Sequence, residues 1–139
     1  MHLLDKDFFR EEHKKYIEDG CHFFSQDSVK LTNLDFRDIN ISSMTKNDFV
    51  YLDPPYFDCR ANYNERNGWL IDSENGLHDF CDKLNKQGIK FAMSNVAKIA
   101  GQENKQLLDW IRINNYDITE FTDCINYTAC SNEVLITNY

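Results

Sequence analysis

Runs of apolar residues predict the first two strands of the chain. Residues 29–34 (Val-Lys-Leu-Thr-Asn-Leu) alternate apolar and polar positions and contain β-branched side chains, which is typical of a strand. Residues 49–52 (Phe-Val-Tyr-Leu) are continuously apolar, which is typical of a short strand buried on both faces of a parallel sheet. Pro54 and Pro55 cannot continue a strand ladder, so we expect the second strand to stop at Asp53.

Helical spacing of apolar residues predicts three helices. Residues 5–19 are rich in charge with a thin apolar face, and Gly20 is expected to end this helix at the C′ position. Residues 77–84 and 107–111 carry apolar side chains three and four positions apart, which predicts two amphipathic helices. Gly88 follows the first of these two and is expected to end its segment.

The remaining apolar runs predict three further strands. They cover residues 89–93, a strand that we expect to end at Ser94-Asn95, and residues 116–121 and 134–136. The polar residues 58–72 predict a long loop. Strands that alternate with helices imply parallel pairing and right-handed crossovers, so we expect an α/β fold. The last two strands follow one another directly and are expected to form an antiparallel pair at one edge.

Length, charge and hydropathy narrow the class of protein. The chain has 139 residues, and no linker or repeat divides it, so we expect one domain over residues 1–139. The formal net charge of -8 argues against a free-standing nucleic-acid binder, because phosphate binding needs clustered Lys and Arg. No apolar run reaches the length of a membrane span, and the N-terminus does not resemble a signal peptide. We therefore expect a cytoplasmic protein.

The cysteines and histidines do not form a recognisable metal or disulfide pattern. The five cysteines are scattered, without C-x-x-C, and no two histidines lie four residues apart, so we expect free thiols and no bound metal. We expect the four histidines to be surface or capping residues and Trp110 to be a core residue. Trp69 is open to two interpretations, as part of a substrate pocket or as a cover for the core. The cysteines and histidines are Cys21, Cys59, Cys81, Cys124, Cys130, His2, His13, His22 and His78.

The segment Asp53-Pro54-Pro55-Tyr56 is the strongest candidate for chemistry. Ligands of open α/β sheets bind beyond the carboxyl ends of the strands, and Asp53 is expected at such an end. The carboxylate and the rigid Pro54 carbonyl are hydrogen-bond acceptors, and Tyr56 adds a flat aromatic face. This combination suits a planar group with an exocyclic amine. A turn or a helix start with a packed surface tyrosine is the simpler interpretation.

These residues resemble a known family. Asp-Pro-Pro-Tyr after a buried strand is similar to motif IV of amino-methyltransferases that use S-adenosylmethionine. The segments Ala61–Trp69, Gly88–Val96 and Glu133–Tyr139 are similar to segments of Dam-like DNA adenine methylases, as is Leu34–Phe36. The likeness covers most of the chain from about Val29 onward. It implies a partial, Rossmann-like S-adenosylmethionine methyltransferase fold, the C-terminal half of a mostly parallel sheet with flanking helices.

The resemblance implies methyl transfer to the amino nitrogen of adenine in double-stranded DNA. The target base must leave the duplex to enter such a site. By analogy, Tyr56 stacks on the flipped base, while Asp53 and the Pro54 carbonyl accept hydrogen bonds from its amino group. Pro55 completes the motif and has no amide donor to compete for that carbonyl. These four residues are the catalytic group that the family pattern implies.

The resemblance also implies residues for the cofactor and the substrate. Asp35 and Phe36, where the first expected strand turns into a loop, match the position that holds the adenine of S-adenosylmethionine, and Asp53 borders the same site. Tyr63 and Asn64 lie in the loop after the motif. They are expected either to reach the flipped base or its phosphate, or only to order the loop.

Two features of the family pattern are missing. The chain has five glycines but no G-x-G, and only fifty-two residues precede Asp53, so the glycine-rich motif I and the target-recognition region are absent. Residues 126–131 also lack the Arg and Lys that contact DNA. We therefore expect a catalytic portion that binds DNA weakly alone and needs a missing N-terminal half or a partner chain. We expect it to be a natural truncation, one part of a split enzyme, or a remnant. Two alternatives are a ribosomal-RNA guanine amino-methyltransferase and a non-catalytic module.

Overall fold

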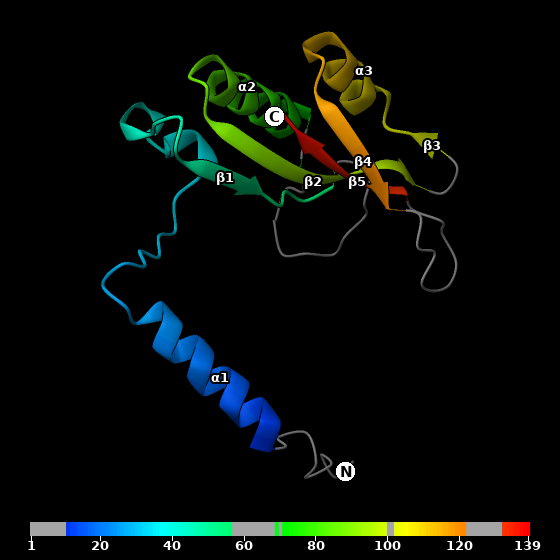
Figure 1. The fold of residues 1–139 in the computed structure, drawn as a ribbon. Coiled ribbons are helices and arrows are strands. Elements are labelled where there is room, and N and C mark those ends of the chain that lie inside the picture. Colours follow the sequence, from blue (N-terminus) through cyan, green and yellow to red (C-terminus); the bar gives the residue numbers. More distant parts are fainter. Residues whose placement is uncertain (1–10, 57–68, 70, 100–101, 122–131) are drawn as a thin grey trace, which may run out of the picture. The chain divides into compact units, whose positions relative to one another are not determined.

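The computed structural model describes residues 11–56, 69, 71–99, 102–121 and 132–139. The chain divides into two compact units, Met1–Asp35 and Phe36–Tyr139. The second unit contains the whole sheet and the helices that pack on it (Figure 1). Whether residues 1–139 function as one domain stays a prediction. None of the described helices has the length and apolar character needed to cross a bilayer.

The described residues of the first unit contain one helix, α1 (Glu11–Phe24). This helix runs through Gly20, so the expected end at that glycine is wrong. A glycine inside a helix costs about 1 kcal/mol relative to alanine and does not by itself stop the hydrogen-bond ladder. Here the ladder continues past it, and the Ser25 amide donates to the Cys21 carbonyl at 3.0 Å.

Residues 29–34 do not form a strand, which corrects a second expectation. Their alternating pattern has no core face to bury, because Leu31 and Leu34 are 70% and 60% exposed. A strand also needs a neighbour for its backbone groups. None of the described residues pairs with this segment. The alternation therefore marks extended chain without a sheet.

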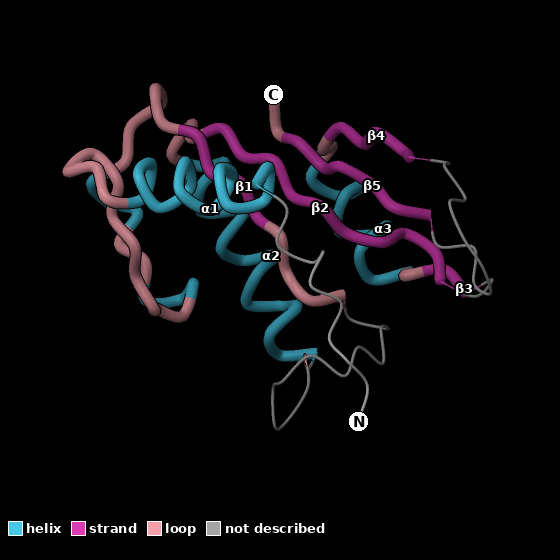
Figure 2. The backbone as a smooth tube through the Cα atoms, turned by 90° about the horizontal axis from the view of Figure 1, so that it is seen from below, coloured by secondary structure: helices cyan, strands magenta, loops and turns pink. Residues whose placement is uncertain are grey.

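The sheet of the second unit has the strand order β1-β2-β5-β4 (Figures 1 and 2). β1 (Phe49–Leu52) and β2 (Lys90–Ile99) are parallel, with Leu52 opposite Met93. β5 (Asn132–Thr137) is antiparallel to β2 and to β4 (Asp117–Phe121). As a result β1, β2 and β4 run in the same direction, and β5 lies between two of them in the opposite direction.

The chain order around the sheet is largely the expected one. α2 (Ile71–Lys86) connects β1 to β2, and α3 (Lys105–Asn114) connects β2 to β4, as predicted. A two-residue strand, β3 (Gln102–Glu103), pairs antiparallel with the end of β2 and was not expected. The expected antiparallel pair of final strands is confirmed.

Two strand predictions need correction. β2 does not end at Ser94 but continues to Ile99, because β5 pairs with its second half. β1 is not buried on both faces, since Phe49 and Tyr51 are 55% and 59% exposed. Only one face of this sheet carries helices within the described residues of the unit, and Figure 1 shows α2 and α3 together on that face.

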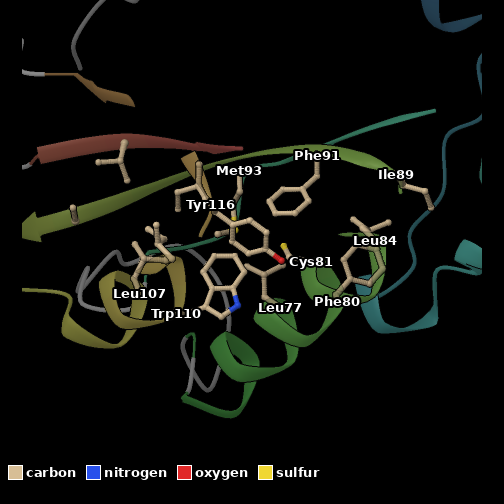
Figure 3. Close-up of a cluster of buried hydrophobic side chains, with 14 residues drawn as sticks. Leu77, Phe80, Cys81, Leu84, Ile89, Phe91, Met93, Leu107, Trp110 and Tyr116 are labelled. Atoms are coloured by element: carbon tan, nitrogen blue, oxygen red, sulfur yellow. The ribbon is translucent and has the colours of Figure 1, made fainter. Parts of the chain in front are cut away.

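The core lies between this helix pair and the sheet (Figure 3). α2 contributes apolar side chains at intervals of three and four residues, which face the strands as one stripe. Gly88, with φ 71°, follows α2, and Asn115, with φ 56°, ends α3 in the left-handed conformation. The buried core residues are Leu77, Phe80, Cys81, Leu84, Ile89, Phe91, Met93, Ala97, Leu107, Trp110, Ile111, Tyr116, Val134 and Ile136.

Candidate active site

Asp53 lies directly after β1, at the carboxyl end of the strand, and its side chain is exposed. The Ser94 hydroxyl donates to Asp53 Oδ1 at 2.7 Å and lies 3.4 Å from the Leu52 carbonyl oxygen. The register explains this contact. Leu52 is opposite Met93, so Ser94 is the first β2 residue beyond the end of β1. The long second strand therefore orients the carboxylate that ends the short one.

The next three residues continue away from the strand end. Pro54 and Tyr56 are half-buried and Pro55 is exposed. The two proline rings hold φ near -65°, which leaves the backbone little freedom beside the carboxylate. Tyr63 and Asn64, expected to contact the substrate, lie outside the described residues.

Phe36 does not lie at a strand end but packs against α2. It begins a short 3₁₀ helix, η2 (Phe36–Asp38), and Asp35 just before it is exposed. The Phe36 ring centroid lies 6.1 Å from that of Trp69 and 5.9 Å from that of Phe80. The Arg37 guanidinium carbon lies 5.2 Å from the same centroid. Phe36 is therefore a half-buried ring held from several sides.

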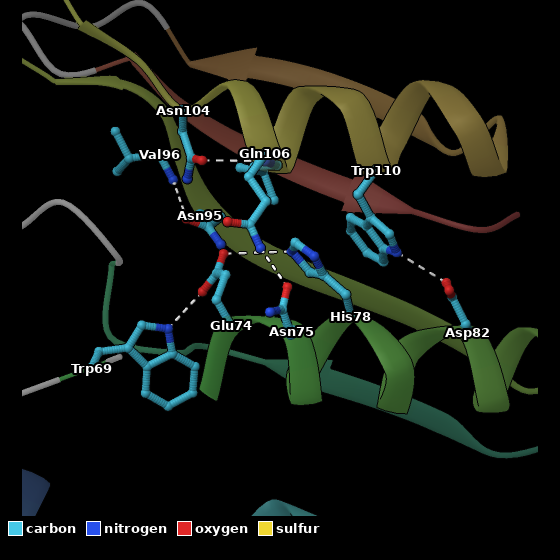
Figure 4. Close-up of polar contacts among 11 residues, drawn as sticks. Trp69, Glu74, Asn75, His78, Asp82, Asn95, Val96, Asn104, Gln106 and Trp110 are labelled. Atoms are coloured by element: carbon cyan, nitrogen blue, oxygen red, sulfur yellow. Dashed lines mark hydrogen bonds and ion pairs between the residues drawn. The ribbon is translucent and has the colours of Figure 1, made fainter. Parts of the chain in front are cut away.

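Glu74 and His78 are functional candidates that sequence patterning missed. Glu74 is 0% exposed and His78 is 6% exposed, so the expectation of a surface histidine is wrong. They lie four residues apart on α2, and His78 Nε2 is 3.5 Å from Glu74 Oε1 (Figure 4). The His78 ring stacks on Trp110 at 4.2 Å between centroids with 3° between planes. The Glu-His spacing beside the apolar stripe was the available sign of this pair.

Trp69 connects the buried carboxylate to Phe36. Its indole Nε1 donates to Glu74 Oε2 at 2.5 Å, and its ring packs against the core beside Phe36. Of the two open interpretations for Trp69, the structure supports a cover for the core. Trp110, on α3, makes a similar bond to another carboxylate of α2: its Nε1 donates to Asp82 Oδ1 at 3.1 Å. Its place in the core is confirmed.

The buried thiol and phenol of the core are protonated groups. Burial raises the pKa of the Cys81 thiol, and the nearby Asp82 and Glu74 carboxylates raise it further. Burial, followed by the hydrogen bond to Asp82, also raises the pKa of Tyr116, whose hydroxyl donates to Asp82 Oδ1 at 2.8 Å. Cys81 is therefore a packing residue and not a nucleophile.

The other cysteine that the structure describes is Cys21, which is an exposed free thiol. Within the described ranges no three His, Cys, Asp or Glu side chains lie close enough together to hold a metal ion. The remaining three cysteines lie outside those ranges.

Comparison with known proteins agrees with the family resemblance that the Asp-Pro-Pro-Tyr segment indicates. Residues 4–124 match the family described as D12 class N6 adenine-specific DNA methyltransferase. The chain is 39% identical over 128 residues to the modification methylase StsI of Streptococcus sanguinis. It is 37% identical over 122 residues to the type II methyltransferase M.FokI of Planomicrobium okeanokoites. It is 31% identical over 106 residues to the modification methylase LlaI of Lactococcus lactis subsp. lactis.

These alignments cover most of this chain and a small part of each relative. They include 80%, 81% and 73% of this chain, but 20%, 18% and 17% of the respective relatives. The family match itself includes the short strand, the four-residue motif and both helices of the sheet layer. The chain belongs to the D12 class of N6 adenine-specific DNA methyltransferases.

Proposed function

We propose that this chain is the catalytic portion of a DNA adenine methyltransferase that acts on an adenine flipped out of double-stranded DNA. One observation carries the proposal: in a chain of this family, the exposed Asp53 carboxylate stands at a strand end, oriented by Ser94 and followed by two prolines and Tyr56. Base flipping brings a planar amine to such an edge. The rigid backbone then presents acceptors to it.

Asp53 and the Pro54 carbonyl accept the two hydrogens of the adenine amino group. This pairing turns the nitrogen lone pair toward the methyl donor, and most of the acceleration comes from that positioning. S-adenosylmethionine, when bound, supplies the methyl group from its sulfonium centre. Methylation would make the adenine amino nitrogen cationic until it releases one proton. Asp53 stabilises that positive charge, so it need not be a strong base. Tyr56 holds the base by stacking.

The residues present fit one part of the cofactor. The half-buried Phe36 ring offers an apolar face and Asp35 an exposed carboxylate, which together suit an adenine ring with its amino group. The methionine part needs close approach of a glycine-rich backbone, and the sequence contains no G-x-G. We therefore propose that another segment of polypeptide completes the cofactor site.

The free edge of β1 is the place we propose for that segment. Among the described residues β1 pairs only with β2, so its other edge presents unpaired backbone groups. Phe49 and Tyr51 on this strand are exposed, and the exposed Tyr139 ring lies 6.1 Å from Phe49. A strand added here would pair the edge and place its own side chains beside the two aromatic rings on the same face. The chain spans about one fifth of its relatives, whose remaining length is ample for such a strand.

The first experiment measures binding of S-adenosylmethionine to the purified chain by calorimetry. Micromolar binding supports a cofactor site within these residues. The second measures methyl transfer to adenine-containing double-stranded DNA by the complete methylating polypeptide or complex. Asp53→Ala is expected to abolish transfer there, whereas Asp79→Ala on the exposed side of α2 leaves it unchanged. Full activity of Asp53→Ala would refute the catalytic assignment.

A second candidate is a non-catalytic module of a methyltransferase. The net charge of -8 and the missing G-x-G favour it. It predicts neither cofactor binding nor a defect in Asp53→Ala. Transfer to a guanine amino group of RNA instead of adenine in DNA would identify the other amino-methyltransferase chemistry.

A further inference from the structure

The side chain of Glu74 is a buried carboxylate at a position where an apolar side chain would also fit the fold. It lies at 0% exposure on a helix face that packs against apolar side chains. Burial of a carboxylate costs free energy, and a well-packed apolar residue at such a position is often neutral or stabilising. A buried carboxylate is therefore weak evidence for stability, and its contacts indicate what else it does.

Its contacts form a chain of fixed groups from α3 to η2. Trp110 is held by Asp82 and stacks on His78, and His78 Nε2 lies 3.5 Å from Glu74. Glu74 Oε2 in turn accepts the Trp69 indole proton at 2.5 Å. Figure 4 shows Trp69, Glu74 and His78 arranged in this order along the helix. Each of the two tryptophans of the chain thus donates to a carboxylate of α2.

Trp69 contacts both Glu74 and Phe36. The two rings lie 6.1 Å apart with 42° between their planes, and Phe80 closes the other side of Phe36 at 5.9 Å. We propose that Glu74 is a positioning residue that holds the Trp69 indole, and through it the Phe36 ring, in the orientation that receives the cofactor's adenine. This inference rests on the proposed function, in which Phe36 contacts that ring.

The variants separate positioning from stability. Glu74→Leu removes the acceptor but keeps an apolar residue of similar length, so the fold is expected to persist. Glu74→Gln keeps an oxygen that can accept the indole proton, and it serves as the conservative rescue. Asp79→Leu changes an exposed carboxylate on the same helix and is the matched control.

Nuclear magnetic resonance of the full chain gives a readout that a purely structural role would not move. Glu74→Leu is expected to shift both the Trp69 indole proton and the Phe36 ring resonances, Glu74→Gln to restore them largely, and Asp79→Leu to leave both unchanged. Resonances of β4 and β5 report that the fold is intact. If the indole proton shifts while the Phe36 ring does not, Glu74 does not act on Phe36 and the inference is wrong.

Calorimetry with S-adenosylmethionine tests whether the contact of Glu74 with Trp69 changes the affinity for the cofactor. Glu74→Leu is expected to bind roughly tenfold more weakly if the variant holds the Phe36 ring in the receiving orientation about one tenth of the time, while Asp79→Leu binds like the wild type. Equal affinity of Glu74→Leu and the wild type would overturn the inference and leave the proposed function standing. Absence of binding by the wild-type chain alone is expected if another segment completes the cofactor site, and the same comparison of variants is then made in the complete methylating assembly, while the resonance shifts still decide the role of Glu74.

Discussion

The two faces of the sheet differ in how far the described residues complete them. On the face under α2 and α3, Phe91, Met93 and Ile136 are fully buried. On the opposite face Phe49 and Tyr51 are more than half exposed, although both belong to the same apolar run as the packed Val50 and Leu52. The covered face under the helices is therefore a packed core, whereas on the open face the side chains of Phe49 and Tyr51 are left largely exposed by the described residues.

This difference separates the residues that stabilise the fold from those proposed to act in catalysis. The buried side chains between sheet and helices stabilise the second unit, while Asp53 and Tyr56 lie where β1 ends, beside the open edge. The residues proposed to contact the substrate therefore lie beside the strand edge that is unpaired among the described residues. We therefore predict that substitutions on the covered face change the stability of the second unit. Substitutions at the open edge of β1 are expected to change assembly or activity.

The largest expected effect is that of Phe91→Ala. Removal of a fully buried phenylalanine side chain leaves a cavity, and such substitutions destabilise by about 3–5 kcal/mol. Tyr51→Ala, on the next strand and the open face, is expected to change the free energy of unfolding by less than about 1 kcal/mol. Urea denaturation followed by circular dichroism measures both. Similar losses for the two variants would abolish the contrast between the faces.

Alkaline pH is expected to weaken the covered face through Cys81. Burial raises the pKa of this thiol in the folded chain, so the folded state keeps the proton that the unfolded state releases. The stabilisation is complete below the ordinary thiol pKa of about 8.5 and is lost as pH rises toward the folded value. Between that pH and the ordinary tyrosine range near 10, the free energy of unfolding falls by up to about 1.4 kcal/mol per pH unit.

The cysteine contribution is isolated by comparing slopes rather than absolute stabilities. In Cys81→Ala the dependence of unfolding free energy on pH is expected to be shallower by that amount, whatever the cost of the lost sulfur. The exposed Cys21→Ala is the matched control and keeps the wild-type slope. Measurements in the presence of a reductant exclude disulfide formation. An unchanged slope in Cys81→Ala would contradict the cause given for the shift.

The fold was predictable where one element's own pattern decides it. The apolar stripe of α2, the prolines after β1 and Gly88 all specify local structure, and each prediction is confirmed. Long-range pairing was not predictable in this way. The extension of β2 to Lys98 depends on pairing with β5, which lies more than thirty residues later, and Ile99 pairs with β3. Residues 29–34 show the reverse case, an alternating pattern without a neighbour.

The types of residue in the candidate site were predictable from the sequence, but the contacts that orient and bury them were not. Asp53 at a strand end follows from the apolar run and the prolines, but its bond to Ser94 depends on the register between β1 and β2. The burial of His78 depends on α3, which brings Trp110 over it. The pattern of one helix predicts its apolar face but cannot show that a neighbouring helix buries a polar pair on it. The roles of Asp35, Phe36, Tyr63 and Asn64 stay predictions.

Ser94→Ala tests whether the open edge carries chemistry rather than stability. The hydroxyl contacts an exposed carboxylate, so its loss is expected to cost about 1 kcal/mol or less of unfolding free energy. Methyl transfer by the complete methylating assembly is expected to fall about tenfold or more, because the carboxylate loses its orientation. Ser94→Thr keeps the hydroxyl and is expected to retain most activity. Full activity of Ser94→Ala would place the orientation of Asp53 elsewhere.

Gly76→Ala gives the smallest expected effect and has the opposite sign. Gly76 lies inside α2, where alanine is favoured over glycine by up to about 1 kcal/mol. A methyl group there would meet Phe36 Cζ at 3.7 Å and Arg37 Cδ at 3.8 Å, which are ordinary contact distances. We therefore expect a gain of about 0.5–1 kcal/mol in thermal or urea unfolding. Because the added methyl also contacts the Phe36 ring without displacing it, affinity for S-adenosylmethionine should stay at the wild-type value. A loss of stability would mean that Phe36 lies closer to α2 than these distances indicate.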